Sequence, residues 1–104
     1  MDSLIQDLQK TIEALETLSD KIPSAREQID EQLDQLFQQK IDLVSATLNV
    51  SSQPYHHASQ AMKQAAAKAT GAVKDPARID EMSKTVAEAI AKLAKLLDNL
   101  TPIA

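Results

Sequence analysis

The chain has 104 residues, of which 43% are apolar and 25% charged, values that suit one small globular domain. It contains no cysteine, so disulfides, thiolate metal sites and thiol nucleophiles are excluded. Its net charge of -4 and its two aromatic residues, Phe37 and Tyr55, do not suit a protein that binds nucleic acid. We therefore expect a single domain over residues 1–104 with no nucleic-acid partner.

The charges are unevenly placed along the chain. Residues 1–52 hold ten acidic and four basic residues, a balance of -6, whereas residues 53–104 hold five and seven, a balance of +2. We expect the acidic first half to pack against the mildly basic second half. The opening MDSLIQDLQK lacks the basic patch and apolar run of a secretory signal, and no apolar run is long enough to span a bilayer. These features predict a cytoplasmic location.

Apolar residues recur every three or four positions over residues 3–22, which is the spacing of one stripe on a helix. The stripe consists of Leu4, Ile5, Leu8, Ile12, Leu15, Leu18 and Ile22. Ser3 and Gln6 have the spacing of a capping box at its start, and Pro23 stops it. A proline permits either a hairpin or a kinked rod here, and the sequence leaves both open.

A second helix is predicted over residues 24–50, beginning with the capping-box pair Ser24 and Glu27. Its apolar residues are Ile29, Leu33, Leu36, Phe37, Ile41, Leu43, Val44, Leu48 and Val50. Lys40 interrupts the spacing of this face. We favour a lysine that snorkels to solvent, and the alternative is a polar seam residue that sets the register of packing.

A third helix, over residues 54–71, is lined with alanine, and Gly71 is the expected residue at its end. Its seam consists of Tyr55, Ala58, Met62, Ala65, Ala69 and Ala72. Small side chains allow a neighbouring helix to approach closely, and we expect the larger Leu33, Leu36, Phe37 and Leu96 to fill the space that remains. The competing interpretation is that alanine serves only as a strong helix former in a weakly packed, mobile segment.

A fourth helix is predicted over residues 76–100, with Asp75 as its N-cap and Pro76 at its first position. Its apolar residues are Ile79, Met82, Val86, Ala89, Ile90, Leu93, Leu96, Leu97 and Leu100. No segment has the period-two pattern of a strand. The sequence therefore predicts an all-α fold, an antiparallel bundle of about four helices, two long and two short, with packing like that of a coiled coil.

Residues that could carry chemistry are scarce. His56 and His57 are the only histidines, and adjacent helical residues point about 100° apart, so they do not share one ion easily. The single glycine cannot build a phosphate-binding loop. We therefore predict no catalytic residue, no cofactor, no metal and no small-molecule substrate, and the chain is not expected to be an enzyme.

What remains is interaction through apolar helix faces. We predict a non-enzymatic protein-interaction module, such as an adaptor, secretion chaperone, assembly factor or inhibitor, whose partner is another protein or a second copy of the chain. The apolar end of the second helix and the alanine seam supply the predicted contact residues, which are Leu43, Val44, Leu48, Val50, Ala58, Met62, Ala65 and Ala69.

Two other classes of function stay open at this point. In the first, the amphipathic stretch over residues 58–74 lies on a membrane or a hydrophobic particle, although it lacks the Trp and Phe that favour such binding. In the second, the chain is a small exported helical-hairpin secretion substrate. Its length suits that class, but it contains no tryptophan for the usual Trp-x-Gly turn.

Overall fold

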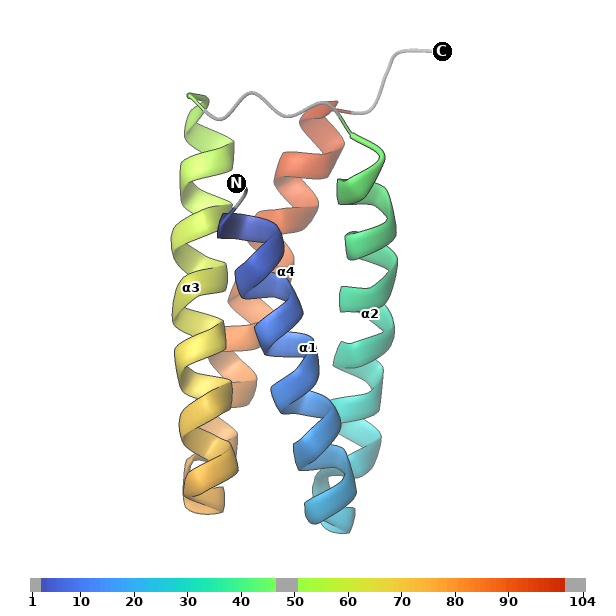
Figure 1. Cartoon of the computed structure of the whole chain (residues 1–104), viewed down its shortest axis with the longest axis vertical. Coiled ribbons are helices and arrows are strands. Elements are labelled where there is room, and N and C mark those ends of the chain that lie inside the picture. The colour runs from blue at the N-terminus through green and yellow to red at the C-terminus, as the bar shows by residue number, and fades with distance from the viewer. Residues whose placement is uncertain (1–2, 47–50, 101–104) are drawn as a thin grey trace.

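The computed structural model describes residues 3–46 and 51–100, in which four α-helices form a bundle of 42 × 23 × 21 Å (Figure 1). The helices are α1 (Ser3–Lys21), α2 (Arg26–Val44), α3 (Gln53–Lys74) and α4 (Ile79–Leu100). Short 3-10 turns, Pro23–Ala25 and Pro76–Arg78, precede α2 and α4. The predicted all-α bundle of about four helices is confirmed.

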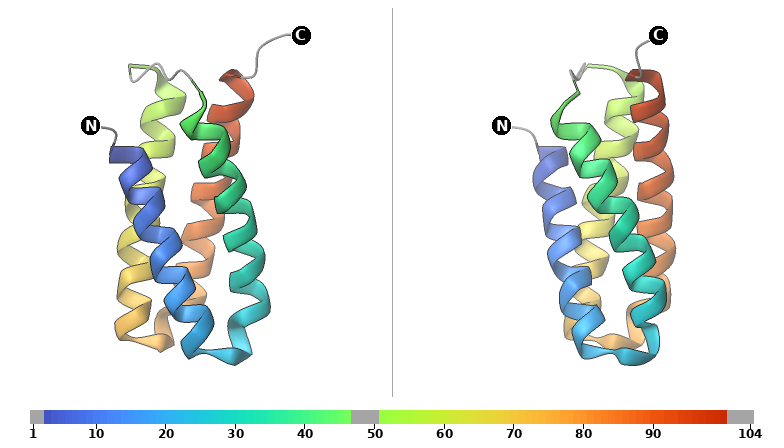
Figure 2. Two further views of the ribbon diagram at one scale, coloured as in Figure 1. Left: turned by 45° about the vertical axis from the view of Figure 1, so that its right-hand side comes forward. Right: turned by 90° about the vertical axis from the view of Figure 1, so that its right-hand side faces the viewer.

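Successive helices run in opposite directions, so the chain forms two antiparallel hairpins, α1–α2 and α3–α4 (Figures 1 and 2). Round the bundle, α1 packs against α2 and α3, and α4 packs against α3 and α2. The chain therefore passes from α2 to the helix diagonally opposite it. As a result α1 runs parallel to its neighbour α3, and α2 runs parallel to its neighbour α4.

The chain makes a hairpin at Pro23, which decides between the two paths that the sequence left open. The capping box predicted for Ser24 and Glu27 is wrong. A 3-10 turn at Pro23 comes before α2, and no side chain caps either the turn or the helix. The hairpin is held instead by side chains that join the two helices. The Ser19 hydroxyl donates to Asp30 Oδ1 at 2.7 Å, and Arg26 Nε donates to the Ser19 carbonyl at 3.0 Å.

Helix α2 ends at Val44, earlier than the apolar pattern predicts. The Ser45 hydroxyl donates to the carbonyl oxygens of Ile41 and Asp42, at 3.1 and 3.2 Å, and so occupies acceptors of the last turn. Residues 47–50, which the prediction also counted as helix, lie outside the described part of the chain.

Helix α3 continues past Gly71 to Lys74, so the predicted helix end at Gly71 is wrong. Gly71 has an ordinary helical backbone without a positive φ, and its carbonyl accepts from the Asp75 amide at 2.9 Å. The Asp75 side chain in turn accepts from the Ala77 amide at 3.2 Å, which confirms the predicted cap. The four helices have 19, 19, 22 and 22 residues, so the two longer helices are α3 and α4, and α2 is shorter than predicted.

The alanine seam of α3 faces the interior, as predicted. Ala58, Ala65, Ala69 and Ala72 are all 0% exposed, and so is Met62 among them. Helix α3 packs closely along both α1 and α4, the two helices beside it. The burial favours the packing interpretation of these alanines over helix propensity alone.

Phe37 departs from the prediction. Leu33, Leu36 and Leu96 belong to the same core as the alanines, at 7%, 0% and 2% exposed, but Phe37 is 40% exposed. The expectation that this phenylalanine fills the space beside the alanines is therefore wrong. It lies instead on the outer side of α2, with Ile41 and Val44.

Candidate interaction surface

The eight residues predicted to contact a partner do not share one surface. Four of them are 0% exposed on the inner face of α3 and pack inside the chain, namely Ala58, Met62, Ala65 and Ala69. Leu43 is 1% exposed and also belongs to the core, whereas Val44 is 62% exposed. Leu48 and Val50 lie outside the described residues. Within the described chain, Val44 is therefore the member of the set that a partner can reach.

Helix α2 carries three large apolar side chains on its outer side. Phe37 is 40% exposed, Ile41 is 64% exposed and Val44 is 62% exposed. Because they are four and then three residues apart, they fall on one face of the helix and form a continuous row. We call these three residues the α2 apolar stripe.

The stripe is outside because other residues of α2 fill the inner face. Neighbouring residues differ by about 100° round a helix, so Phe37 points well away from Leu36, which is 0% exposed. The inner face is made by four apolar residues and two glutamines, namely Ile29, Gln32, Leu33, Leu36, Gln39 and Leu43. Two positions that a hydrophobic pattern would assign to apolar residues are thus taken by amides.

These amides join α2 to α4. Gln32 Nε2 donates to the Ser83 carbonyl at 3.0 Å, and Gln39 Nε2 donates to the Ile90 carbonyl at 2.9 Å. Gln28 Nε2 donates to the Ser83 hydroxyl at 2.6 Å. We call Gln28, Gln32 and Gln39 the glutamine seam. Because it ties α2 to α4 at several points, it holds the rotation of α2 that leaves the apolar stripe outside.

The apolar pattern of α2 did not predict the glutamine seam, because glutamines are not part of that pattern. Its signal is present in the sequence, since glutamines at positions 28, 32, 35 and 39 repeat at the spacing of a helix face. Gln32 and Gln39 are each 8% exposed, and in the described chain their Oε1 atoms have no hydrogen-bond partner. The seam therefore holds two buried acceptors that make no hydrogen bond, and each of them lowers the stability of the α2–α4 interface.

Lys40 lies on the side of α2 that faces α1. It is half-buried, and its ammonium donates to Gln9 Oε1 of α1. The lysine therefore ends on a neighbouring helix, as a polar seam residue does, and not simply in solvent. Lys40 is three residues after Phe37 and four before Val44, so its ammonium lies on the flank of that face towards α1, where Gln9 accepts from it.

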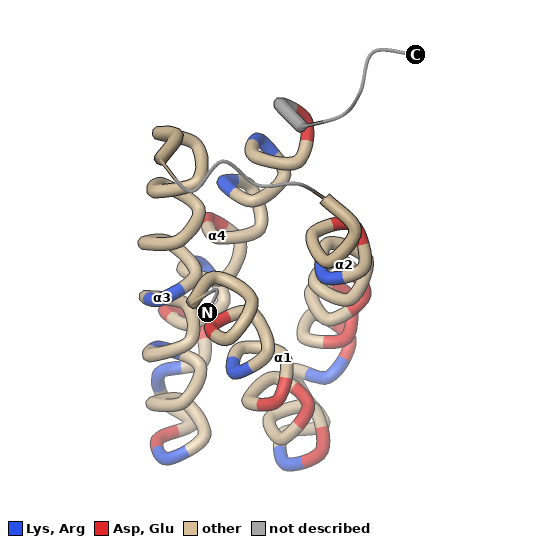
Figure 3. The backbone as a smooth tube through the Cα atoms, turned by 45° about the horizontal axis from the view of Figure 1, so that its top comes forward, with Lys and Arg blue, Asp and Glu red and all other residues tan. Residues whose placement is uncertain are grey.

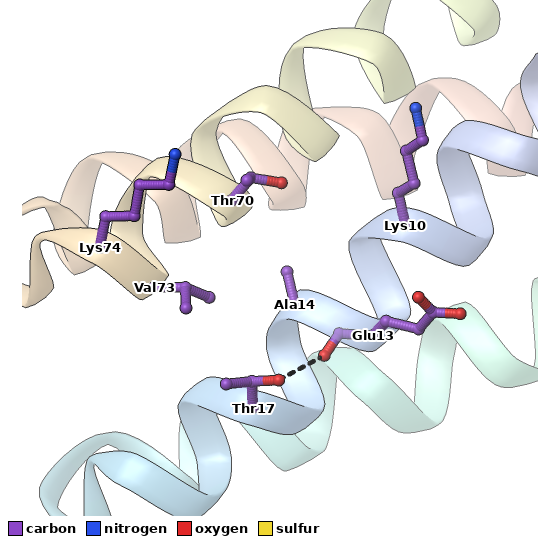
Figure 4. Close-up of a pocket in the computed structure, with 7 residues that line it drawn as sticks. All are labelled: Lys10, Glu13, Ala14, Thr17, Thr70, Val73 and Lys74. Carbon is purple, nitrogen blue, oxygen red and sulfur yellow. Dashed lines mark hydrogen bonds between the residues drawn. The ribbon is translucent and has the colours of Figure 1, made fainter.

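A shallow groove lies between α1 and α3 and has a volume of about 280 Å³ (Figure 4). Lys10 and Lys74 stand at its rim, from opposite helices. Its hydroxyl groups are engaged with their own helices, because Thr17 donates to the Glu13 carbonyl at 3.1 Å and Thr70 donates to the Ala66 carbonyl at 2.8 Å. Neither hydroxyl is paired with a general base, so the groove lacks the arrangement of a nucleophilic site.

Two further hollows lie between neighbouring helices. One of about 390 Å³ lies between α2 and α4 and is lined by Gln28, Gln32, Asp80, Ser83, Lys84 and Ala87. The other, of about 100 Å³, lies where α3 begins and α4 ends, beside His57, Lys92 and Lys95. All three of these basic residues are exposed. The described residues contain no group of three or more His, Asp or Glu that could hold a metal ion.

Two salt bridges form among the described residues, and both lie in the second half of the chain. Lys68 of α3 pairs with Glu81 of α4, and Arg78 pairs with Asp75 at 3.5 Å. The hydrogen bond from Lys68, with its positive charge, lowers the pKa of the Glu81 carboxyl below its ordinary value. These exposed pairs join the α3–α4 hairpin and leave the acidic residues of α1 and α2 without a cationic partner within the described chain.

The acidic half of the sequence becomes one side of the molecule. Figure 3 shows acidic residues clustered along α1 and α2, with most basic residues on α3 and α4. The two halves do pack against each other, through α1–α3 and α2–α4. No salt bridge in the described ranges joins them, however, so the acidic surface of α1 and α2 stays available to solvent.

Comparison with known proteins finds no matching family model, no similar curated protein and no similar solved structure. Function must therefore be inferred from the chain's own surfaces.

Proposed function

We propose that this chain is a non-enzymatic protein-interaction module, of the adaptor, chaperone, assembly-factor or inhibitor kind, that binds a partner protein through the α2 apolar stripe. The observation that carries the proposal is the alignment of Phe37, Ile41 and Val44, exposed by 40%, 64% and 62%, on one helix face. Single exposed apolar residues are common on protein surfaces. A row at this spacing is the pattern by which one helix recognises another.

The inner face of α2 is packed in the core and holds the stripe in a fixed position. Leu36 and Leu43 anchor the same helix in the core, at 0% and 1% exposed. The glutamine seam adds hydrogen bonds that hold the rotation of α2 against α4. A surface that is already ordered before binding costs less entropy when a partner arrives.

The absence of catalysis is part of the same proposal. It rests on the cysteine-free sequence and on the adjacent pair His56 and His57, both exposed at the start of α3. His56 meets the Tyr55 ring edge-on, with centroids 6.1 Å apart, which suits a structural contact. We also propose a cytoplasmic location, which a chain without cysteine fits.

A site-specific photocrosslinking experiment tests the binding surface. A photoreactive amino acid placed at Ile41 in the full chain, expressed in its own host, should form a discrete adduct with a protein. The same group at Gln64, an exposed position of α3, is the matched control and should form little adduct. Mass spectrometry of the adduct then tells another protein from a second copy of this chain.

The proposal fails if position 41 gives no adduct, or if positions 41 and 64 give the same adducts in equal amount. Both variants are first shown to be folded by their circular dichroism and thermal unfolding. Both positions are exposed, so we expect the fold to tolerate the probe.

A membrane-active protein is the second candidate, and the burial of the alanine seam weighs against it. The apolar side chains of residues 58–74 that would enter a lipid surface, such as Met62 and Ala65, are 0% exposed in the bundle. The bundle would have to open before they could contact lipid. None of the helices in the described ranges combines the length and the apolar run that crossing a bilayer requires. Flotation of the protein with anionic vesicles tests this candidate, which fails if the protein stays in the aqueous layer.

A further inference from the structure

We propose that the occupant of the α2 apolar stripe is a single amphipathic helix of another protein that carries lysine or arginine beside its apolar face. This inference rests on the proposed function and names the chemistry of the partner. It follows from the shape of the stripe, from its size and from the charges next to it.

The shape of the stripe fits a helix. From Phe37 to Val44 the stripe spans eight residues, which are seven steps of 1.5 Å, or about 10 Å and two helical turns. A partner helix with apolar side chains at the same spacing of four and three residues presents a matching row.

The size of the stripe fits one helix better than a second bundle. Three partly exposed apolar side chains offer at most a few hundred Å² of apolar surface. A standard protein interface buries about 800 Å² on each partner, so a stable dimer built on the stripe alone lacks area. A short helix that lies along α2 needs no larger apolar contact.

An acidic row lies on the outer side of α2, on the flank of the stripe away from Lys40. Asp34, Gln38 and Asp42 are each four residues apart and are all exposed. Asp34 lies about 60° round the helix from Phe37, whereas Asp42 lies about 100° from Ile41 and so points further from the stripe. Gln38 Nε2 donates to Asp42 Oδ1 at 3.2 Å. Neither aspartate forms a salt bridge in the described chain. The row therefore presents two carboxylates without a salt bridge on the outer side of α2, and Asp34 is the one nearer to the stripe.

Two other charges lie near the stripe, one basic on the flank towards α1 and one acidic on the line of the stripe. Lys40 is the nearest basic residue along the helix, and its ammonium is bound to Gln9 on the side of α1. Asp30, one turn before Asp34, adds a further negative charge, although its carboxylate accepts from Ser19. An apolar row flanked by carboxylates complements an apolar row flanked by ammonium or guanidinium groups.

Designed peptides test the charge requirement on the full chain. One helical peptide carries leucines at the spacing of the stripe with flanking lysines, a second has glutamates in place of the lysines, and a third scrambles the leucines of the first. Binding is followed by fluorescence anisotropy of the labelled peptides at low and high salt. We expect the lysine peptide to bind about tenfold more tightly than the glutamate peptide at low salt, the effect of two favourable ion pairs. The preference should shrink at high salt.

Variants of the chain locate the effect. Asp34→Asn with Asp42→Asn should remove most of the preference for the lysine peptide, while Asp34→Glu should keep it. Asp80→Asn with Glu88→Gln is the matched control, because these exposed acids have the same eight-residue spacing on α4 and should leave binding unchanged. Phe37→Ser with Ile41→Ser should abolish binding of both leucine-striped peptides.

The outcomes separate the partner chemistry from the proposed function. If both leucine-striped peptides bind equally and lose binding with Phe37→Ser and Ile41→Ser, the cationic partner is wrong while the interaction surface stands. If the lysine peptide binds those serine variants or the scrambled peptide binds as well, the attraction is unspecific and the inference fails. It fails also if the free chain forms a dimer that Ile41→Ser dissociates, or if Ile41 mediates binding to anionic vesicles.

Discussion

Helices α2 and α3 use their residues in opposite ways. Helix α3 buries the smallest side chains, such as Ala65 and Ala69 at 0% exposed. Helix α2 exposes Phe37 and Ile41 while it buries Gln39 at 8% exposed. The difference teaches that a residue is buried when its helix face meets a neighbour, and that side-chain size and polarity alone do not decide this.

The two helices also hold to their neighbours by different forces. Helix α3 packs closely against α1 and α4 along an alanine seam, where contact between apolar groups dominates. Helix α2 meets α4 less extensively and through amide hydrogen bonds. The outer side of α2 is consequently the part of the described chain that offers a row of large apolar residues to a partner.

The largest expected effect tests which side of α2 faces inwards. Leu36→Ala should lower the free energy of unfolding by about 2–5 kcal/mol, because it leaves a cavity at a position that is 0% exposed. Phe37→Ala, the neighbouring change, should lower it by less than about 1 kcal/mol, because that ring is on the surface. Urea unfolding followed by circular dichroism measures both. A larger loss from Phe37→Ala than from Leu36→Ala would contradict the rotation of α2 described above.

The next effect tests the close packing of α3. Ala65→Leu should lower the free energy of unfolding by about 1–3 kcal/mol, because the larger side chain overfills a position that is 0% exposed. Ala67→Leu, at an exposed position of the same helix, is the control and should change stability by less than about 0.5 kcal/mol. Equal unfolding midpoints for the two variants would show that the seam leaves room for larger side chains.

A smaller effect of opposite sign tests the glutamine seam. Gln39→Met should raise the free energy of unfolding by about 1 kcal/mol, because it removes a buried Oε1 that has no partner in the described chain. The lost hydrogen bond to the Ile90 carbonyl offsets only part of this gain. Gln35→Met, at an exposed position, should have little effect. Marked destabilisation by Gln39→Met in thermal unfolding would contradict this prediction. It would mean that the hydrogen bond from Gln39 Nε2 stabilises the α2–α4 interface by more than the unpaired Oε1 destabilises it.

The smallest effect concerns the glycine inside α3. Gly71→Ala should raise the free energy of unfolding by about 0.5–1 kcal/mol, because alanine restricts the unfolded chain and favours the helix. A Cβ at position 71 meets no atom within 4 Å, so the change introduces no clash. Ala67→Gly in the same helix should lower stability by a similar amount. A loss of stability from Gly71→Ala, measured by differential scanning calorimetry, would contradict the helical conformation of this residue.

Local signals predicted the fold well. The apolar period of three and four residues placed all four helices, and Asp75 with Pro76 marked the turn before α4. These signals act over one or two helical turns, so the helices that they predict do not depend on how the helices pack together. Two other local signals were overruled. The capping pair at Ser24 gave way to a 3-10 turn, and Gly71 stayed helical because the cap lies at Asp75.

The candidate surface was predicted only in part. Val44 was expected to contact a partner and is exposed, whereas Leu43, next to it, is buried. The apolar residues of α2 cover an arc that is wider than one packing face. The sequence therefore does not show which part of this arc faces the core. That choice depends on how Gln32 and Gln39 meet the backbone of α4.

The sequence by itself determined an all-α chain with four amphipathic helices, one of them lined with alanine, and an acidic first half, because each of these follows from local spacing and composition. Only the tertiary structure decided that the chain crosses to the diagonal helix after α2 and that α2 turns its glutamines inwards and Phe37 outwards. The physical reason is that the rotation of a helix about its axis is set by contacts with segments about 50 residues away in sequence, such as Gln39 with Ile90.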